Sequence, residues 1–410
     1  MPAVFKRIFI SQEKMKSSPA FNPRWLLLGL LILAGLVCTL LLRNIPSTTS
    51  LGRNDFIGYW SATYLLRSGQ NPYDLQLMDQ LQHVQMKTGL DATIMAWNPP
   101  TLFVLLLPLS WLSFTTARFV WLTINLIIVL TASLMVARLY IPKGNNAFAL
   151  IFLAFAMGFP QVLSGFYMGQ VTFLVYLGLV GCMVLIRKGQ WFWAGAALIL
   201  TIHKPQLVVL PLIYLLIIMA RQGQYRGWAG LFMAGAVCSI ILFILRPACI
   251  SDVLGEMKIA PVHWATPTIG GFLSYLQITE LARSLILLLL PLPFILALTP
   301  AGISMETAVA LLTLITIPTT FFGWSYDQTM LLIPVAQVFG WMSGSRNKIV
   351  NFWFGLAMII ALGFNYIERA RATNEVYYLW VPLFWWILFG VSWRFFSSGI
   401  STAGRVPQPA

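Results

Sequence analysis

The side chains that could support chemistry are few, and they stand at the edges of long apolar runs. Asp55 follows the first of these runs, and a carboxylate there could accept a proton from a hydroxyl group. Lys204 interrupts another apolar stretch, where an ammonium group could hold a phosphate. Each residue also has a simpler interpretation. Asp55 could only cap a helix, and Lys204 could only extend its charged end towards water.

The composition indicates that these residues are positioned by membrane helices. Residues of the types AVILMFWYC make up 59% of the 410-residue chain and DEKR only 9%, against about 45–50% and about 25% in soluble domains. These values exclude a soluble, a disordered and a disulfide-stabilised protein. The net charge of +14 is explained by Lys and Arg in cytoplasmic loops, so no nucleic-acid partner is predicted.

Cysteine and histidine do not form a recognisable metal-binding pattern. The four cysteines lie in or beside apolar runs and are interpreted as small core residues, and the three histidines stand far apart; they are Cys38, Cys182, Cys238, Cys249, His83, His203 and His263. No phosphate-binding loop or metal cage appears. We therefore predict no cofactor and no bound metal, and the use of a divalent cation stays open.

The apolar runs predict an all-α polytopic membrane protein. They are 25–43, 97–113, 117–137, 147–162, 169–186, 191–202, 206–220, 228–246, 281–298, 304–322, 329–343, 349–364 and 376–396. Placing the short basic loops in the cytoplasm requires an odd number of crossings between 97 and 137, so the Pro-rich run 97–113 is predicted to be re-entrant or partial. About 12 transmembrane helices remain. The predicted organisation is a cytoplasmic segment 1–24, one transmembrane catalytic domain 25–396 and a cytoplasmic tail 397–410.

The outer face carries most of the acids on this topology. Every Asp and Glu except Glu13 and Glu306 falls outside, which indicates either polar chemistry there or merely solvated loops. The outer loop 44–96 is predicted to hold two interfacial helices. One begins at Asn54 or Asp55 and is ended by Gly69, and Asp74 caps the other. The outer loop 247–283 suits a flexible cover over a site.

The order of these motifs resembles a known family. An Asp after the first helix, then Tyr59-Trp60, GQNPYD and NPP, looks like the polytopic GT-C glycosyltransferases of family 87. Gly169-Gln170, Lys204-Pro205 and the stretch WSYDQTMLLIP follow in the family's order. The resemblance covers the chain from about residue 25 to 345. The family includes mycobacterial mannosyltransferases that use polyprenyl-phosphate-mannose.

The resemblance implies a GT-C helical bundle in the bacterial inner membrane, with its active face outward. It also implies a polyprenyl-phosphate-linked sugar donor, a glycolipid or glycan acceptor and Asp55 as the catalytic residue. With Asp55 as a single general base, direct displacement predicts inversion at the anomeric carbon. Mycobacterial relatives carry histidines in the late motif, where this chain has Tyr326-Asp327, so the sugar stays open among mannose, glucose, arabinose and others. The remaining predicted site residues are Lys204 and His203 for the donor phosphate and Tyr59, Trp60, Asp74, Gln170, Tyr326, Asp327 and His263 for sugar or acceptor.

A transporter or a lipid-linked sugar flippase is the alternative function. Broken helices are typical of transporters, which use them to build substrate sites near the midplane. However, we find no clear inverted repeat between the halves, and the acids collect at the outer ends of the runs. This distribution favours the enzyme.

Overall fold

The structure consists of helices throughout the part of the chain that it describes. The computed structural model describes residues 54–86, 91–256, 264–299, 303–345, 347–371 and 373–396, and within these ranges no strand occurs. The all-α polytopic fold class is therefore confirmed. The predicted first crossing 25–43, the segment 1–24 and the tail 397–410 lie outside the described residues.

Five helical stretches within these ranges are long and apolar enough to cross a bilayer. Three of them are single helices: α5 (Phe114–Tyr140), α11 (Tyr225–Leu245) and α18 (Lys348–Ala370). The fourth, Leu281–Leu298, consists of η5 (Leu281–Ser284), α14 (Leu285–Leu288) and α15 (Pro291–Leu298). The fifth, Glu375–Phe396, consists of η7 (Glu375–Leu379) and α19 (Trp380–Phe396). A sixth candidate is the pair α6 (Asn146–Met157) and α7 (Pro160–Met168), which is bent by 45°.

Shorter apolar helices account for five of the six other predicted runs that the structure describes, and α17 (Leu332–Gly344) overlaps the sixth, 329–343. The shorter helices are α4 (Thr101–Leu106) with η2 (Leu107–Trp111), α8 (Thr172–Arg187), α9 (Trp191–Ala197) with η3 (Leu198–His203), α10 (Val209–Arg221) and α16 (Met305–Thr319). The other elements that follow α4 in the chain are η4 (Pro205–Leu207), α12 (Cys249–Glu256), α13 (Ile269–Tyr275) and η6 (Ser325–Leu331). The figure of about 12 crossings stays a prediction, because several helices are too short to span alone.

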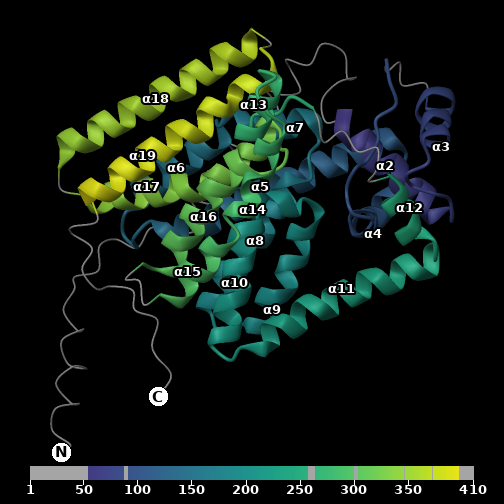
Figure 1. The fold of residues 1–410 in the computed structure, drawn as a ribbon, viewed down its shortest axis with the longest axis horizontal. Coiled ribbons are helices and arrows are strands. Elements are labelled where there is room, and N and C mark those ends of the chain that lie inside the picture. Colours follow the sequence, from purple (N-terminus) through teal and green to yellow (C-terminus); the bar gives the residue numbers. More distant parts are fainter. Residues whose placement is uncertain are drawn as a thin grey trace, which may run out of the picture.

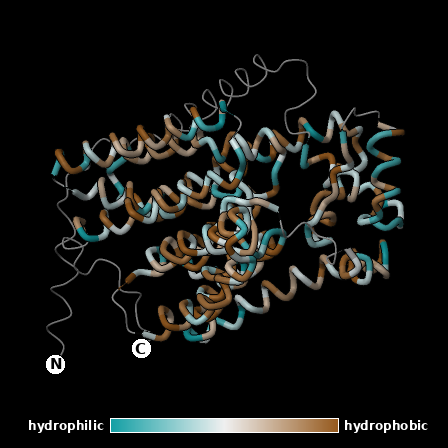
Figure 2. The backbone as a smooth tube through the Cα atoms, turned by 45° about the horizontal axis from the view of Figure 1, so that its top comes forward, coloured by the Kyte–Doolittle hydropathy of each residue, from teal (hydrophilic) through white to brown (hydrophobic). Residues whose placement is uncertain are grey.

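Helix α8 lies at the centre of the bundle. It packs against α5 and α9, and α11 runs from α9 towards α4 (Figure 1). Hydrophobic residues follow the helices along their length, and hydrophilic residues gather at turns and helix ends (Figure 2). Large apolar side chains such as Phe243 on α11 and Ile359 on α18 are exposed. Such exposed faces fit contact with lipid rather than water.

The two ends of the bundle carry different ion pairs. Arg187 Nε lies 2.6 Å from Glu306 Oε1, and the hydroxyl of Tyr140 donates to the carbonyl of Glu306. Glu306 is predicted to lie on the cytoplasmic side, and Arg187 with Lys188 follows the run 169–186 in one of the short basic loops placed on that side. Their contact agrees with this common placement. The other end contains Asp55 and Asp327, two of the acids predicted to lie outside.

The first outer loop folds into α2 (Asn54–Arg67), α3 (Leu75–Asp79) and η1 (Gln80–Gln85). Gly69, with φ of +71°, follows the end of α2, as predicted. Asp74 Oδ1 accepts hydrogen bonds from the backbone N–H groups of Gln76 and Leu77, which is the predicted cap of the second helix. α2 differs from the expected interfacial helix because α4, η2 and α5 cover it on most sides.

Candidate active site

Six of the predicted side chains meet at one end of the bundle and form what we call the polar cluster. Its members are Asp55, Tyr59, Gln170, Lys204, Tyr326 and Asp327, which come from α2, the α7–α8 turn, the η3–η4 break and η6. Charged side chains in a low-dielectric setting gain much more from pairing than they would in water. The ion pair between Lys204 and Asp327 within the cluster is buried and therefore gains more from pairing than an exposed ion pair would.

Lys204 provides the positive charge of the polar cluster. Its Nζ lies 2.7 Å from Asp327 Oδ1 and 2.8 Å from Gln170 Oε1. The same ammonium group lies 4.8 Å from the centre of the Tyr326 ring, in cation–π geometry. The whole residue is only 7% exposed. Lys204 is thus a buried, paired cation and not a side chain that extends into water.

The break at Pro205 holds Lys204 in this position. Lys204 separates η3 from η4 and has φ −144° and ψ 68°, because Pro205 has no N–H to continue a helix. Backbone carbonyls freed by the break need partners inside a membrane. Asn98 Nδ2 donates to the carbonyl of His203, and Thr320 Oγ1 donates to that of Gln206.

Asp327 is the counter-ion of Lys204. Its Oδ1 also accepts a hydrogen bond from the hydroxyl of Thr172, and its Oδ2 accepts one from the backbone N–H of Trp324 at 3.0 Å. The residue is 2% exposed. Both carboxylate oxygens of Asp327 are thus engaged by donors from the protein itself. Asp327 is therefore better placed to hold Lys204 than to contact a substrate hydroxyl.

Gln170 connects Lys204 to Asp55. Its amide oxygen accepts hydrogen bonds from Lys204 Nζ and from the Tyr59 hydroxyl, the latter at 3.2 Å, while its Nε2 donates to Asp55 Oδ2. The backbone is fixed as well, since Asn125 Nδ2 donates to the Gln170 carbonyl. Gly169, with φ of +74°, makes the turn that presents Gln170.

Asp55 has the properties of a general base. Burial raises the pKa of Asp55 from 3.8 to about 6, and the Asp327 charge adds to this rise. The charge of Lys204 and hydrogen bonds from Gln170 and Tyr326 limit the rise. A carboxyl group with a pKa just below neutrality is mostly ionised at pH 7 and still accepts a proton readily.

The other predicted site residues do not join the polar cluster. Trp60 Nε1 donates to the carbonyl of Leu109, and its ring packs on Tyr64 and Phe114. Asp74 caps α3. The His203 side chain is buried, and neither ring nitrogen has a hydrogen-bond partner in the part of the chain described. His263 lies outside the described residues.

Several supporting residues were not predicted from the sequence. Thr172 holds Asp327, and its position two residues after Gln170 was the available signal. Glu375 accepts hydrogen bonds from the backbone N–H and the hydroxyl of Ser325, at 2.9 and 3.0 Å. This contact fixes the start of η6, which carries Tyr326 and Asp327. No local pattern singles out Glu375.

Comparison with known proteins identifies the part of the chain that contributes two members of the polar cluster. Residues 97–255 match the family model of Glycosyltransferase family 87. The resemblance to this family inferred from the motifs is confirmed. The family 87 match covers less than half of the chain and includes Gln170 and Lys204, whereas Asp55 and Asp327 lie outside the matched residues. No curated protein and no solved structure matches the chain.

The family 87 match indicates a membrane-embedded glycosyltransferase, in agreement with the apolar helices. Such an enzyme acts on a sugar donor and an acceptor. Within the described ranges, no group of three or more His, Cys, Asp or Glu side chains gathers as metal ligands would. The charged side chains of the polar cluster are Asp55, Lys204 and Asp327.

Proposed function

We propose that the protein transfers a sugar from a polyprenyl-phosphate donor to an acceptor hydroxyl, at the outer face of the bacterial inner membrane, with Asp55 as general base. The observation that carries the proposal is the hydrogen-bonded connection from Lys204 through Gln170 to Asp55. It connects a cation that can bind the donor phosphate, Lys204, with a carboxylate that can accept a proton from the acceptor hydroxyl, Asp55. The acceptor is a glycolipid or glycan.

The proposed reaction is a single displacement. Asp55 takes the proton of the acceptor hydroxyl while the acceptor oxygen bonds to the anomeric carbon of the donor sugar. The bond from that carbon to the phosphate oxygen breaks, and its electron pair leaves with the polyprenyl phosphate. One displacement inverts the anomeric centre, whereas two would retain it.

Lys204 stabilises the departing phosphate in this proposal. An ammonium group has three N–H donors. Among the described residues, Gln170 and Asp327 accept from two of them, so the third can donate to a phosphate oxygen. Negative charge that develops in a low-dielectric site gains much from a cation already in place. The polyprenyl chain needs apolar surface, and the exposed apolar side chains of the helices, such as Ile359 on α18, offer such surface.

A transporter or flippase remains the second candidate. The bend between α6 and α7 and the break at Pro205 favour it, because interrupted helices often form transport sites. The family 87 match favours the enzyme instead. Membranes that contain the protein, incubated with a panel of radiolabelled polyprenyl-phosphate sugars, should attach one labelled sugar to an acceptor. Movement of the donor across the bilayer without any transfer would support the flippase.

The proposed topology predicts that α3 and the end of α17 lie on opposite sides of the membrane. Gln76 and Gly344 are both exposed, and a Cβ at Gly344 meets nothing within 4 Å. In a background with the native cysteines replaced by serine, Gln76→Cys should react with an impermeant maleimide from outside. Gly344→Cys should react only after permeabilisation. Labelling of both from one side would overturn the topology.

The activity should fall in acid as Asp55 becomes protonated. Only the ionised carboxylate accepts the acceptor's proton, so kcat/KM is expected to decline as the pH drops through about 6, the raised pKa of Asp55. Gln170→Leu removes a hydrogen bond that lowers this pKa, and should therefore move the midpoint to higher pH. The measurement is a pH–rate profile of both proteins, and an identical midpoint would contradict the coupling.

A further inference from the structure

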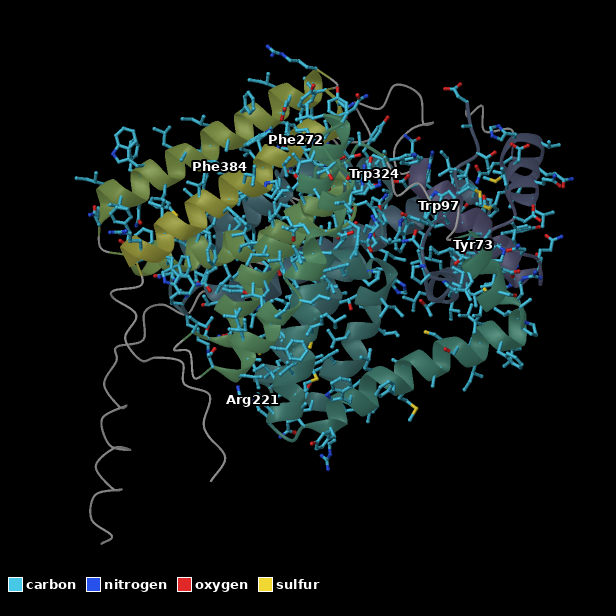
Figure 3. All side chains as sticks on the ribbon, viewed as in Figure 1. Tyr73, Trp97, Arg221, Phe272, Trp324 and Phe384 are labelled. Atoms are coloured by element: carbon cyan, nitrogen blue, oxygen red, sulfur yellow. The ribbon has the colours of Figure 1, made fainter. Side chains whose placement is uncertain are left out.

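A row of aromatic rings leads from the polar cluster to the exterior of the structure. The Tyr326 ring, which Lys204 contacts, stacks near Trp324 with ring centroids 6.3 Å apart and planes at 27°. Trp324 in turn meets Trp264 at 5.4 Å and 70°. Figure 3 labels Trp324 on the side of the bundle that faces α2 and α3. Trp264 is 52% exposed, so the row ends at an open aromatic face.

The position of Trp264 is fixed by a folded segment. The buried guanidinium group of Arg283 donates to the carbonyl of Trp264 at 3.2 Å, and it also contacts Glu280 at 2.7 Å. Thr268 caps α13 through the N–H of Gly271. A Cβ on Gly271 would lie 2.3 Å from the Thr266 carbonyl oxygen, so this turn has no space for a larger residue.

A second connection holds the same segment against the polar cluster. Tyr275 of α13 lies 6.0 Å from Tyr377 of η7, measured between ring centroids. η7 also contains Glu375, whose carboxylate holds Ser325 directly after Trp324. Trp264 and Trp324 are thus positioned by two routes, one through Arg283 and one through η7. A site formed by these two rings is organised before any ligand binds.

We propose that Trp264 and Trp324 form the subsite that binds a pyranose ring of the acceptor, a proposal that rests on the proposed glycosyl transfer. The C–H groups on one face of a pyranose make an apolar, slightly positive surface, which matches the negative face of an aromatic ring. Two rings at 70° offer a corner that contacts the face and the edge of one sugar.

The location favours the acceptor over the donor sugar. The donor sugar must lie between Lys204 and Asp55, because its anomeric carbon is bonded to the phosphate. The aromatic row instead leads from the cluster towards an exposed face at Trp264, where the rest of a glycan or glycolipid headgroup can remain in water. A sugar held there would present a hydroxyl towards the polar cluster.

Interfacial tryptophans can also serve as membrane anchors, and a matched control separates the two roles. Trp193 is 63% exposed and pairs with Phe192 at 5.3 Å in a T-shaped arrangement, much like Trp264 with Trp324. Trp193 lies beside the predicted cytoplasmic loop at Arg187 and Lys188. Trp193→Ala therefore removes an exposed, paired indole without affecting the proposed subsite.

The test measures binding without catalysis. The full chain is reconstituted in nanodiscs of phosphatidylethanolamine and phosphatidylglycerol, and saturation-transfer NMR records binding of methyl α-D-mannopyranoside and methyl α-D-glucopyranoside. We expect Trp264→Ala and Trp324→Ala to weaken binding of the bound glycoside by about tenfold. Trp264→Tyr and Trp324→Phe keep an aromatic ring and should retain most of the glycoside binding. Trp193→Ala should not change the binding.

The outcomes distinguish this subsite from the proposed reaction. Asp55→Asn should bind the glycoside as the wild-type protein does while it loses transfer. If Asp55→Asn loses transfer but the Trp264 and Trp324 variants bind normally, the subsite is wrong and the reaction stands. Binding that depends on the two tryptophans in a protein without transfer activity would refute the reaction and with it the acceptor role, and would leave these rings as a sugar-binding site. No glycoside signal from the wild-type protein, or equal losses in Trp193→Ala, would overturn the subsite.

Discussion

Asp55→Asn should reduce the turnover of sugar transfer by about 10²-fold or more, because an amide does not accept a proton at neutral pH. Asn has nearly the same shape as Asp, and its oxygen can still accept the hydrogen bond from Gln170 Nε2. The pKa of Asp55 is raised from 3.8 to about 6, so ionising this carboxyl group destabilises the folded protein as the pH rises through that window. Asn has no such titration. The melting temperature of Asp55→Asn at pH 8 should therefore equal or exceed that of the wild-type protein.

The matched control for this substitution is Asp74→Asn. Asp74 lies in the same outer loop and caps α3, and Asn caps helices about as well as Asp. We expect this variant to keep its turnover within about threefold of wild type. Transfer rates in membranes, normalised to the amount of inserted protein, give the comparison. Turnover of Asp55→Asn close to that of Asp74→Asn would remove the base assignment, and Asp327 would be the next carboxylate to test.

The helices were predictable because their signals are local. Apolar runs of the length that a bilayer requires, interrupted by Pro and charge, mark most of the helical stretches. Gly69 ends α2 and Asp74 caps α3 through backbone contacts within a few residues, so the sequence nearby contains the whole signal. The break at Pro205 was predictable for the same reason, since a missing N–H is a property of one residue.

The membership of the polar cluster was predictable for a different reason. Charged residues are so costly beside apolar runs that the few that occur usually have a partner or a function. The predicted sidedness places Asp55 and Asp327 on the same face, and the structure brings both of them to Lys204. The specific pairing was not predictable. Lys204 and Asp327 are 123 positions apart, and the contact depends on how α8, η4 and η6 pack.

The orientation of α2 was also beyond sequence analysis. Apolar and small residues occur on all its sides, so its periodicity does not show which face meets the polar cluster. Tyr59 points to Gln170, whereas the adjacent Trp60 points to Leu109. Neighbouring residues on a helix point about 100° apart, and only the position of η2 and Gln170 shows which one reaches the site.

Lys204→Ala should abolish most transfer and also destabilise the protein, because it leaves Asp327 buried without its counter-ion. Removal of one member of a buried ion pair typically costs about 3–5 kcal/mol of stability. Loss of activity alone would therefore not show that Lys204 binds the donor phosphate. Lys204→Arg keeps the positive charge and should therefore retain part of the activity. It should not retain all of it, because the planar guanidinium group of Arg does not fit the position of an ammonium group.

The double variant Lys204→Met/Asp327→Leu separates the two roles of Lys204. Replacing both members of a buried ion pair with apolar residues of similar size is often neutral or stabilising, so thermal melting of the solubilised protein should return towards the wild-type temperature. Transfer should stay as low as in Lys204→Ala, because no cation remains near the departing phosphate. Recovery of stability without activity identifies Lys204 as a donor ligand. Recovery of both would show that Lys204 only neutralises Asp327, and the phosphate would then need another cation.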